Sequence, residues 1–458
     1  MNNKNTNGIE TLLGDPKKAI IKLSIPMIVA MVVQTLYTVV NRIWVSGLGV
    51  DPAAAVGFAF PFLFMGTAIA TGIGIGGGSA ISRKIGANNK EGADSAAVHT
   101  LIVMAIIAIA YSIPLFVFAE SIFSAMGAGQ TTATAALYAR IMYTASIISF
   151  FSLTALAILR SEGDVKRAMF AMVIGGILNV FLDPIFIYVF GLGVPGAAYA
   201  AVVSMTIPAV LLFYWLFRKK DTYITFNFRG FHFDKGIIKD ILAVGLPASV
   251  MQLSMSIMLI LMTVIVQHVS GTDGVAVFSA GWAIATMASM PLLGMASAVV
   301  SVTGAAYGAR EYKKLDIAHL YAIKIGIIIE TSIAALTFIF APIITMAFTQ
   351  SSDMAGLSDE IITFLRIICV YYPAIAFGML STAMFQGAGK GLYSLIVTIL
   401  RTIILIVPLA WIFSSVFGWG LGGAWWGLVT ANVIGSAITF VWAKIYVNNL
   451  LKKPIPTT

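Results

Sequence analysis

Two acidic residues, Asp183 and Glu330, are the only ones among the 19 acids of the chain that lie clearly within long apolar segments. A charge buried in an apolar segment that crosses a membrane is costly, so such an acid is a candidate for function. Asn179 precedes Asp183 by four residues, which places both side chains on one face of a helix. Pro184 follows directly, and because it has no N–H it frees the carbonyl of Val180. The pattern predicts a polar site around Asp183.

A second polar face lies on the first apolar segment, where Gln34, Tyr37 and Asn41 are spaced by three and four residues. Asn41 and Asp183 each lie about two helical turns from the same end of their segments, so the two faces are expected to meet. A buried carboxylate with polar neighbours can exchange a proton for a cation or for a conformational change. We therefore expect Asp183, Asn179 and Asn41 to form one polar site that can take up a proton or a cation.

Other interpretations of these residues stay open. Asp183 can be a structural carboxylate in a salt bridge with Arg140, and Asn41 can be an interhelical hydrogen-bonding residue. Glu330 can line a cavity or have a hydrogen-bonded packing role. Methionines on one helical stripe suit either the wall of a cavity that accepts many shapes or simple packing; they are residues 251, 255, 258 and 262.

The elements that must position these residues are membrane helices. Of the 458 residues 59% are hydrophobic and only 10% are charged, whereas a soluble domain carries about 25% charged residues. A spanning helix needs about 20 mostly apolar residues. Twelve stretches meet this length, which predicts an all-α polytopic membrane protein with twelve transmembrane helices; they lie near 20–46, 54–82, 97–119, 133–159, 168–190, 196–217, 238–267, 276–307, 318–347, 361–387, 393–416 and 424–446.

The basic residues predict the topology. Lys and Arg occur before the first stretch, in every second connection and in the C-terminal tail, whereas the alternate connections contain none. This is the positive-inside pattern, and it predicts a multi-pass protein of the inner or plasma membrane with both termini in the cytoplasm. The formal charge of +9 is then a topology signal, and we expect no nucleic-acid partner. The polar N-terminus has no signal-peptide pattern, so the first stretch is expected to remain as a span.

The two halves of the chain repeat each other. AIIKLSIPMIVAMVVQ (19–34) matches DILAVGLPASVMQLSM (240–255), and SRKIGANNKEGADSA (82–96) matches GAAYGAREYKKLDIA (304–318). Each half has six helices, so the halves enter the membrane in the same orientation and are parallel repeats. We expect an N-terminal six-helix lobe at 1–217, a basic cytoplasmic linker at 218–237 and a C-terminal six-helix lobe at 238–458.

Enzymatic chemistry has little support in the sequence. The single cysteine, Cys369, lies in an apolar run, and the four histidines have no metal-ligand spacing. No nucleophile–base pair or HExxH pattern is visible within the spans, so we expect no enzyme and no cofactor besides the coupling ion. The glycine run at 72–78 is not a phosphate-binding loop, and its spacing instead lets its helix approach a neighbour closely.

Four segments carry a resemblance to a known family: QTLYTVVNRIWVSGLG (34–49), GGGSAISRKIGANNKEGA (76–93), ILRSEGDVKRAM (158–169) and NVFLDPIFIYVFGLGVPGAAYA (179–200). The chain resembles the multidrug and toxic-compound extrusion (MATE) transporters, most closely their DinF-like prokaryotic branch. The resemblance implies a secondary-active exporter that moves amphipathic, often cationic compounds outward by alternating access, coupled to inward H⁺ or Na⁺ flow. It assigns the coupling site to Asn179, Asp183 and the position of Asn41.

The chain departs from that branch at Asn41, where Asp is common, and an amide cannot titrate. We expect Gln34, Tyr37 and Tyr138 to support the substrate or ion site. The alternative function is a flippase for lipid-linked saccharides or other lipid-like substrates, which usually has a more cationic cavity. We expect the partners to be small amphipathic molecules and membrane lipid, and the protein to be a monomer.

Overall fold

The computed structural model describes residues 6–46, 50–219, 221–227, 231–348 and 356–452, and every regular element within them is helical. Eleven of these helices are long and apolar enough to cross a membrane. A twelfth span results if Gly129–Thr144 and Ser146–Ser161, which meet at a bend of 47°, count as one. Helices are expected because the backbone of a spanning segment must satisfy its own hydrogen bonds. The predicted all-α polytopic fold is confirmed.

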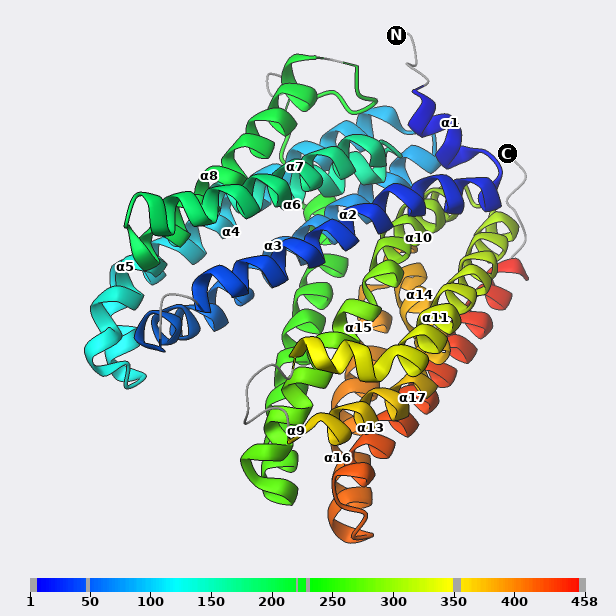
Figure 1. The fold of residues 1–458 in the computed structure, drawn as a ribbon. Coiled ribbons are helices and arrows are strands. Elements are labelled where there is room, and N and C mark those ends of the chain that lie inside the picture. The colour runs from blue at the N-terminus through cyan, green and yellow to red at the C-terminus, as the bar shows by residue number, and fades with distance from the viewer. Residues whose placement is uncertain (1–5, 47–49, 220, 228–230, 349–355, 453–458) are drawn as a thin grey trace. The chain divides into compact units, whose positions relative to one another are not determined.

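The chain forms two compact units (Figure 1). Unit 1 comprises Met1–Gly14 and Val29–Ser249, and unit 2 comprises Asp15–Ile28 and Val250–Thr458. Two long helices, α2 (Pro16–Ser46) and α9 (Lys235–Ala288), therefore belong to unit 1 in one part and to unit 2 in the other.

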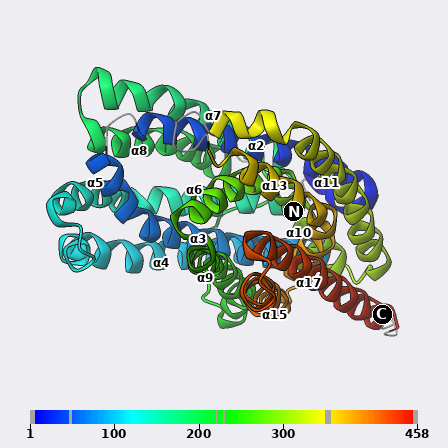
Figure 2. The ribbon, with the colours of Figure 1, turned by 60° about the horizontal axis from the view of Figure 1, so that its bottom comes forward.

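Unit 1 contains the short helix α1 (Asn7–Leu13) and six longer ones: α3 (Val50–Gly86), α4 (Lys90–Ala125), α5 (Thr132–Thr144), α6 (Ser146–Ser161), α7 (Val165–Pro184) and α8 (Gly193–Phe213). α3 packs against α4 and α6, and α7 lies beside α8 (Figure 2). A Cβ on Gly77 would come within 2.3 Å of Thr100 on α4, so the predicted close approach of the glycine run is present.

The segment before α9 is fastened to unit 1 by polar contacts. The backbone N–H of Ile224 donates to Glu162 Oε2 at 2.9 Å, and Arg167 pairs with Asp221 at 2.6 Å. The backbone N–H of Asp234 donates to Nε2 of the His99 ring at 2.9 Å. Glu162 lies in the connection between α6 and α7 with 1% of its surface exposed, and this burial raises its pKa to about 8.

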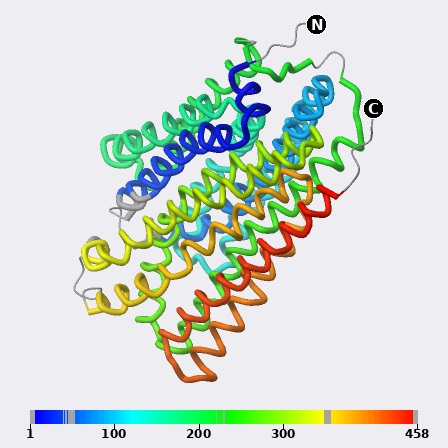
Figure 3. Tube along the Cα trace, turned by 90° about the vertical axis from the view of Figure 1, so that its right-hand side faces the viewer, coloured from blue at the N-terminus to red at the C-terminus, as the bar shows by residue number. Residues whose placement is uncertain are grey.

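Unit 2 contains α10 (Met290–Gly308), α11 (Tyr312–Phe348), α13 (Ser358–Ile368), α14 (Tyr372–Gly387), α15 (Gly391–Ile399), α16 (Ile406–Trp411) and α17 (Gly420–Leu451). α14 packs against α10, α11 and α17, and the red α17 runs beside the orange α14 in Figure 3. The span expected near 276–307 is shared between the end of α9 and α10. Within α9, Gly271 has φ 65°, which breaks the helix between two expected spans.

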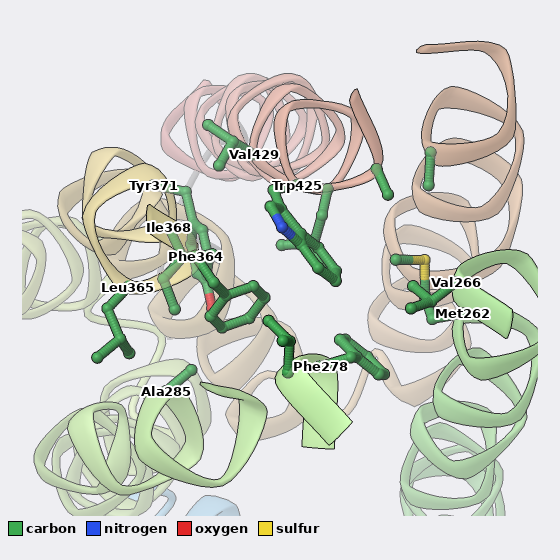
Figure 4. Close-up of a cluster of buried hydrophobic side chains, with 14 of the residues drawn as sticks. Met262, Val266, Phe278, Ala285, Phe364, Leu365, Ile368, Tyr371, Trp425 and Val429 are labelled. Atoms are coloured by element: carbon green, nitrogen blue, oxygen red, sulfur yellow. The ribbon is translucent and has the colours of Figure 1, made fainter. Parts of the chain in front are cut away.

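The core of unit 2 is an aromatic cluster (Figure 4). The Trp425 ring stacks on Phe278 at 5.8 Å and meets Phe364 edge-on at 4.7 Å. Such pairs contribute about 0.5–1.5 kcal/mol each beyond the area that they bury. Met258 and Met262 are fully buried in this cluster, so these two members of the methionine stripe have a packing role.

Candidate functional site

The centre of the candidate site lies on the last turns of α7. Asn179 Nδ2 donates to Asp183 Oδ1 at 3.2 Å, and both side chains are buried, Asp183 completely. The one-turn spacing that predicted a shared face therefore produces a direct hydrogen bond. After Pro184 the chain continues as a π-helical turn, Ile185–Val189, a feature that often marks functional sites.

α2 brings the second group. Asn41 Nδ2 donates to Asn179 Oδ1 at 3.1 Å, so the two faces expected to meet are in contact. A close approach of the helices permits this bond. A Cβ on Gly176, one turn before Asn179, would lie 3.3 Å from the ring of Tyr37 and 3.4 Å from Val33. Asn41 thus reaches Asp183 through the amide of Asn179.

α8 adds a residue that the prediction did not include in the site. The second N–H of the Asn179 amide donates to Ser204 Oγ at 3.2 Å, and Ser204 itself donates to the carbonyl of Ala200. Ser204 is buried, with 2% of its surface exposed. The only sequence signal for Ser204 is that it is a polar residue, two turns after Ala197, on a helix that has few polar side chains.

One oxygen of the site has no partner. Asp183 Oδ2 is buried and accepts no hydrogen bond from any described residue. An unpaired oxygen of a buried carboxylate costs free energy unless a proton or a cation satisfies it. The site therefore has the chemistry to take up and release one positive charge.

The remaining predicted residues surround this centre. Tyr37 and Tyr138 are half-buried, and both lie within electrostatic range of the Asp183 carboxylate. Gln34 lies one turn before Tyr37 and is exposed, with its side chain interacting with the Tyr37 phenol. Tyr37 and Tyr138 thus belong to the surroundings of Asp183, whereas Gln34 is at their edge.

The proposed ion pair between Asp183 and Arg140 is not formed. Arg140 Nη2 lies 3.6 Å from Glu120 Oε2, and its Nε donates to the carbonyl of Phe116 at 3.3 Å. Asp183 is bonded to Asn179 instead, and its carboxylate forms no ion pair with a basic side chain in the described part of the chain.

In the structure the Asn179 amide presents its N–H groups, rather than its oxygen, to the Asp183 carboxylate. Asn179 directs its N–H groups toward Asp183 and Ser204, and its oxygen already accepts from Asn41. A Na⁺ bound at Asp183, Asn179 and Asn41 would require these amides to turn their oxygens toward it, since hard cations bind through oxygen.

Unit 2 holds the second intramembrane acid. Glu330 on α11 is completely buried, and neither of its carboxylate oxygens has a hydrogen-bond partner among the residues described. The phenols of Tyr371 and Tyr372 lie within electrostatic range of it. The expected hydrogen-bonded packing role therefore has no hydrogen bond to support it.

Comparisons with known proteins identify the family of the chain. The MatE family profile matches residues 26–185 and 247–412, one stretch in each half. Multidrug export protein MepA of Staphylococcus aureus (strain MW2) is 26% identical over 422 residues, covering 91% of this chain and 90% of MepA. The probable multidrug resistance protein YoeA of Bacillus subtilis (strain 168) is 25% identical over 442 residues, covering 93% and 94%.

Solved structures give the same answer. A structure described as the outward-facing conformation of a multidrug resistance MATE family transporter is 46% identical and superposes with a TM-score of 0.96, covering 98% of this chain and 100% of that one. Members of this family are transporters rather than enzymes. The chain is a multi-pass membrane protein that belongs to the MATE family of multidrug efflux transporters.

Proposed function

We propose that the protein is a secondary-active multidrug exporter in which Asp183 carries the coupling proton. The observation that carries this proposal is the unpartnered, buried Oδ2 of Asp183, which is linked through Asn179 to residues of two further helices. Binding a proton strongly stabilises a carboxylate in that place, because protonation removes a charge from the interior of the protein.

The network can convert this proton into a conformational change. When Asp183 is ionised, the amide of Asn179 donates to it and holds Asn41 and Ser204 through its other atoms. When Asp183 takes up a proton on Oδ2, this oxygen becomes a hydrogen-bond donor that needs an acceptor. The preferred arrangement of α2, α7 and α8 therefore changes. Alternating access then requires that substrate bind better to the ionised form, since a ligand shifts an equilibrium only by its differential affinity.

A proton is proposed over Na⁺ on two grounds. The amide donors face the carboxylate, as described above, and a single unpaired oxygen accommodates one proton without further ligands. Asn41 supplies no second titratable group, so we propose that the site exchanges one proton per cycle.

The substrate class follows from the relatives and from the charge of the site. MepA and YoeA are named as multidrug proteins, and a buried carboxylate suits amphipathic, often cationic compounds that compete with the proton. A lipid-linked saccharide flippase is not favoured, because it would need a cationic site. We propose further that the protein acts as a monomer in the cell membrane. We also propose that both termini lie in the cytoplasm, because Lys and Arg are concentrated in every second connection.

Efflux from reconstituted vesicles tests this function. A fluorescent lipophilic cation is loaded, and ΔpH or ΔNa⁺ is imposed separately. We expect ΔpH alone to drive wild-type efflux and Asp183→Asn to abolish it, while Glu91→Gln, which changes an exposed acid of the same unit, behaves like wild type. Efflux driven only by ΔNa⁺, or full efflux by Asp183→Asn, would contradict the proposal.

A further inference from the structure

A cleft opens in unit 1 where α5 bends into α6. It has a volume of about 350 Å³ and is lined by Ser112, Ile113 and Phe116 of α4 and by Tyr143 and Ile147 on either side of the bend. The two helices meet at a bend of 47°. Because of this bend they run in different directions beside α4, which leaves the space of the cleft.

The cleft is apolar and opens at the surface of the protein. Ser112 Oγ donates to the carbonyl of Ala108 at 2.6 Å, so its hydroxyl is satisfied within its own helix. Ile113 and Phe116 are 58% and 43% exposed. Since α4 and the bent pair are long and apolar enough to cross a membrane, lipid acyl chains are expected to reach this cleft.

Two opposite charges lie at one end of the cleft. Arg140 donates to the carbonyl of the lining residue Phe116, and its guanidinium lies 6.0 Å from that ring. Glu120, one turn along α4, lies 3.6 Å from Arg140, beyond hydrogen-bonding distance. The side chains are 36% and 64% exposed, so each can still accept a further partner.

We propose that this cleft binds a phosphatidylethanolamine-type lipid, with an acyl chain in the cleft, the phosphate at Arg140 and the ammonium at Glu120. The lining from Ile109 to Val117 extends about 12 Å along α4, which accommodates a large part of one acyl chain. A guanidinium suits phosphate through paired N–H groups, and an ammonium donates to a carboxylate. The glycerol headgroup of phosphatidylglycerol lacks the ammonium, and choline has no N–H to donate.

The internal repeat supplies a matched comparison. Phe-Val-Phe-Ala at 116–119 recurs as Phe-Ile-Phe-Ala at 338–341, and Arg366 lies over Phe338 at 5.3 Å as Arg140 lies over Phe116. Pro342 occupies the position that corresponds to Glu120. The second half therefore keeps the cation over the ring but has a proline in place of the acid at this position.

Native mass spectrometry of the full chain tests the proposal, with phosphatidylethanolamine, phosphatidylcholine and phosphatidylglycerol added in equal amounts. We expect wild type to retain phosphatidylethanolamine about two- to fivefold more than the other two lipids. This ratio corresponds to the free energy that an exposed ion pair contributes to binding. Glu120→Gln should abolish this preference while lipid is still retained, and Arg140→Gln should lower retention of all three. Arg366→Gln should leave the preference unchanged.

Filling the cleft is the second arm. Ser112→Phe should lower lipid retention, whereas Ser332→Phe, at an exposed serine of α11 with the same bond to its own helix, should not. Equal retention of the three lipids by wild type would overturn the proposal. So would an equal loss in Arg140→Gln and Arg366→Gln. If Ser112→Phe does not fold, Glu120→Gln still decides, because its exposed side chain tolerates substitution.

Discussion

Asn41 on α2 donates a hydrogen bond of 3.1 Å to Asn179 on α7, although 138 positions separate the two residues in the chain. This bond joins the part of α2 that belongs to unit 1 to the residue that holds the Asp183 carboxylate. Since position 41 is an amide, Asp183 is the only carboxylate in this network among the described residues.

Asn41→Asp is expected to change the stoichiometry of coupling. A second carboxyl group beside Asn179 would carry its own proton, because two neighbouring carboxylates repel each other when both are ionised. Two protons should then be exchanged per substrate instead of one, as measured by the ΔpH that just balances a fixed substrate gradient. Asn41→Gln, which keeps an amide, is the control, and an unchanged balance point in Asn41→Asp would exclude position 41 from the site.

Ser204→Ala is expected to destabilise unit 1. The change leaves one N–H of the buried Asn179 amide without an acceptor, at a cost of about 1–3 kcal/mol. Thermal unfolding of the purified protein in detergent measures the loss. Thr206→Ala removes a hydroxyl that bonds only to its own helix, at the carbonyl of Val202, and should have a smaller effect. Equal stability of the two variants would show that the Ser204 contact is unimportant.

Gly176→Leu is expected to weaken transport by separating α2 from α7. Its side chain would have to occupy space held by Tyr37 and Val33, only 3.3 and 3.4 Å from the position of a Cβ. The Asn41–Asn179 bond would lengthen or break, and a hydrogen bond worth about 0.5–1.5 kcal/mol predicts a loss of coupled efflux of up to about tenfold. Gly57→Leu is the control, because no atom lies within 4 Å of its Cβ position. Similar efflux by both variants would contradict this role of the helix contact.

Glu162→Gln is expected to remove a pH dependence of stability. Burial raises the pKa of Glu162 from 4.5 to about 8, so between these values the folded protein binds a proton that the unfolded chain has lost. Stability therefore falls as pH rises through this window and levels off above about pH 8. Melting temperatures across pH 5–9 measure the slope, which should be shallower in Glu162→Gln and unchanged in the exposed variant Glu91→Gln. Parallel curves for wild type and Glu162→Gln would contradict the assignment.

The set of membrane-spanning helices could be predicted from the sequence because such helices are recognised by their length and hydropathy. The twelve stretches, the all-α class and the site helices follow from that rule, and the one-turn spacing of Asn179 and Asp183 required only helix geometry. Depth within the membrane was enough to predict that Asn41 would approach Asp183.

Contacts that depend on how helices rotate and bend were out of reach. Ser204 faces Asn179 only because α8 lies against α7 in one orientation, and Arg140 lies beside Glu120 of α4 rather than beside Asp183. The break at Gly271 and the division of the following span between α9 and α10 likewise depend on local backbone geometry that periodicity does not reveal.

Proton release on substrate binding tests the central claim most directly. The purified protein is mixed with a lipophilic cation in weakly buffered detergent solution, and the pH change is recorded. We predict release of close to one proton per bound cation from wild type and none from Asp183→Asn, with binding confirmed in both by fluorescence. Release of the same number of protons by Asp183→Asn would contradict the claim that Asp183 carries the coupling proton.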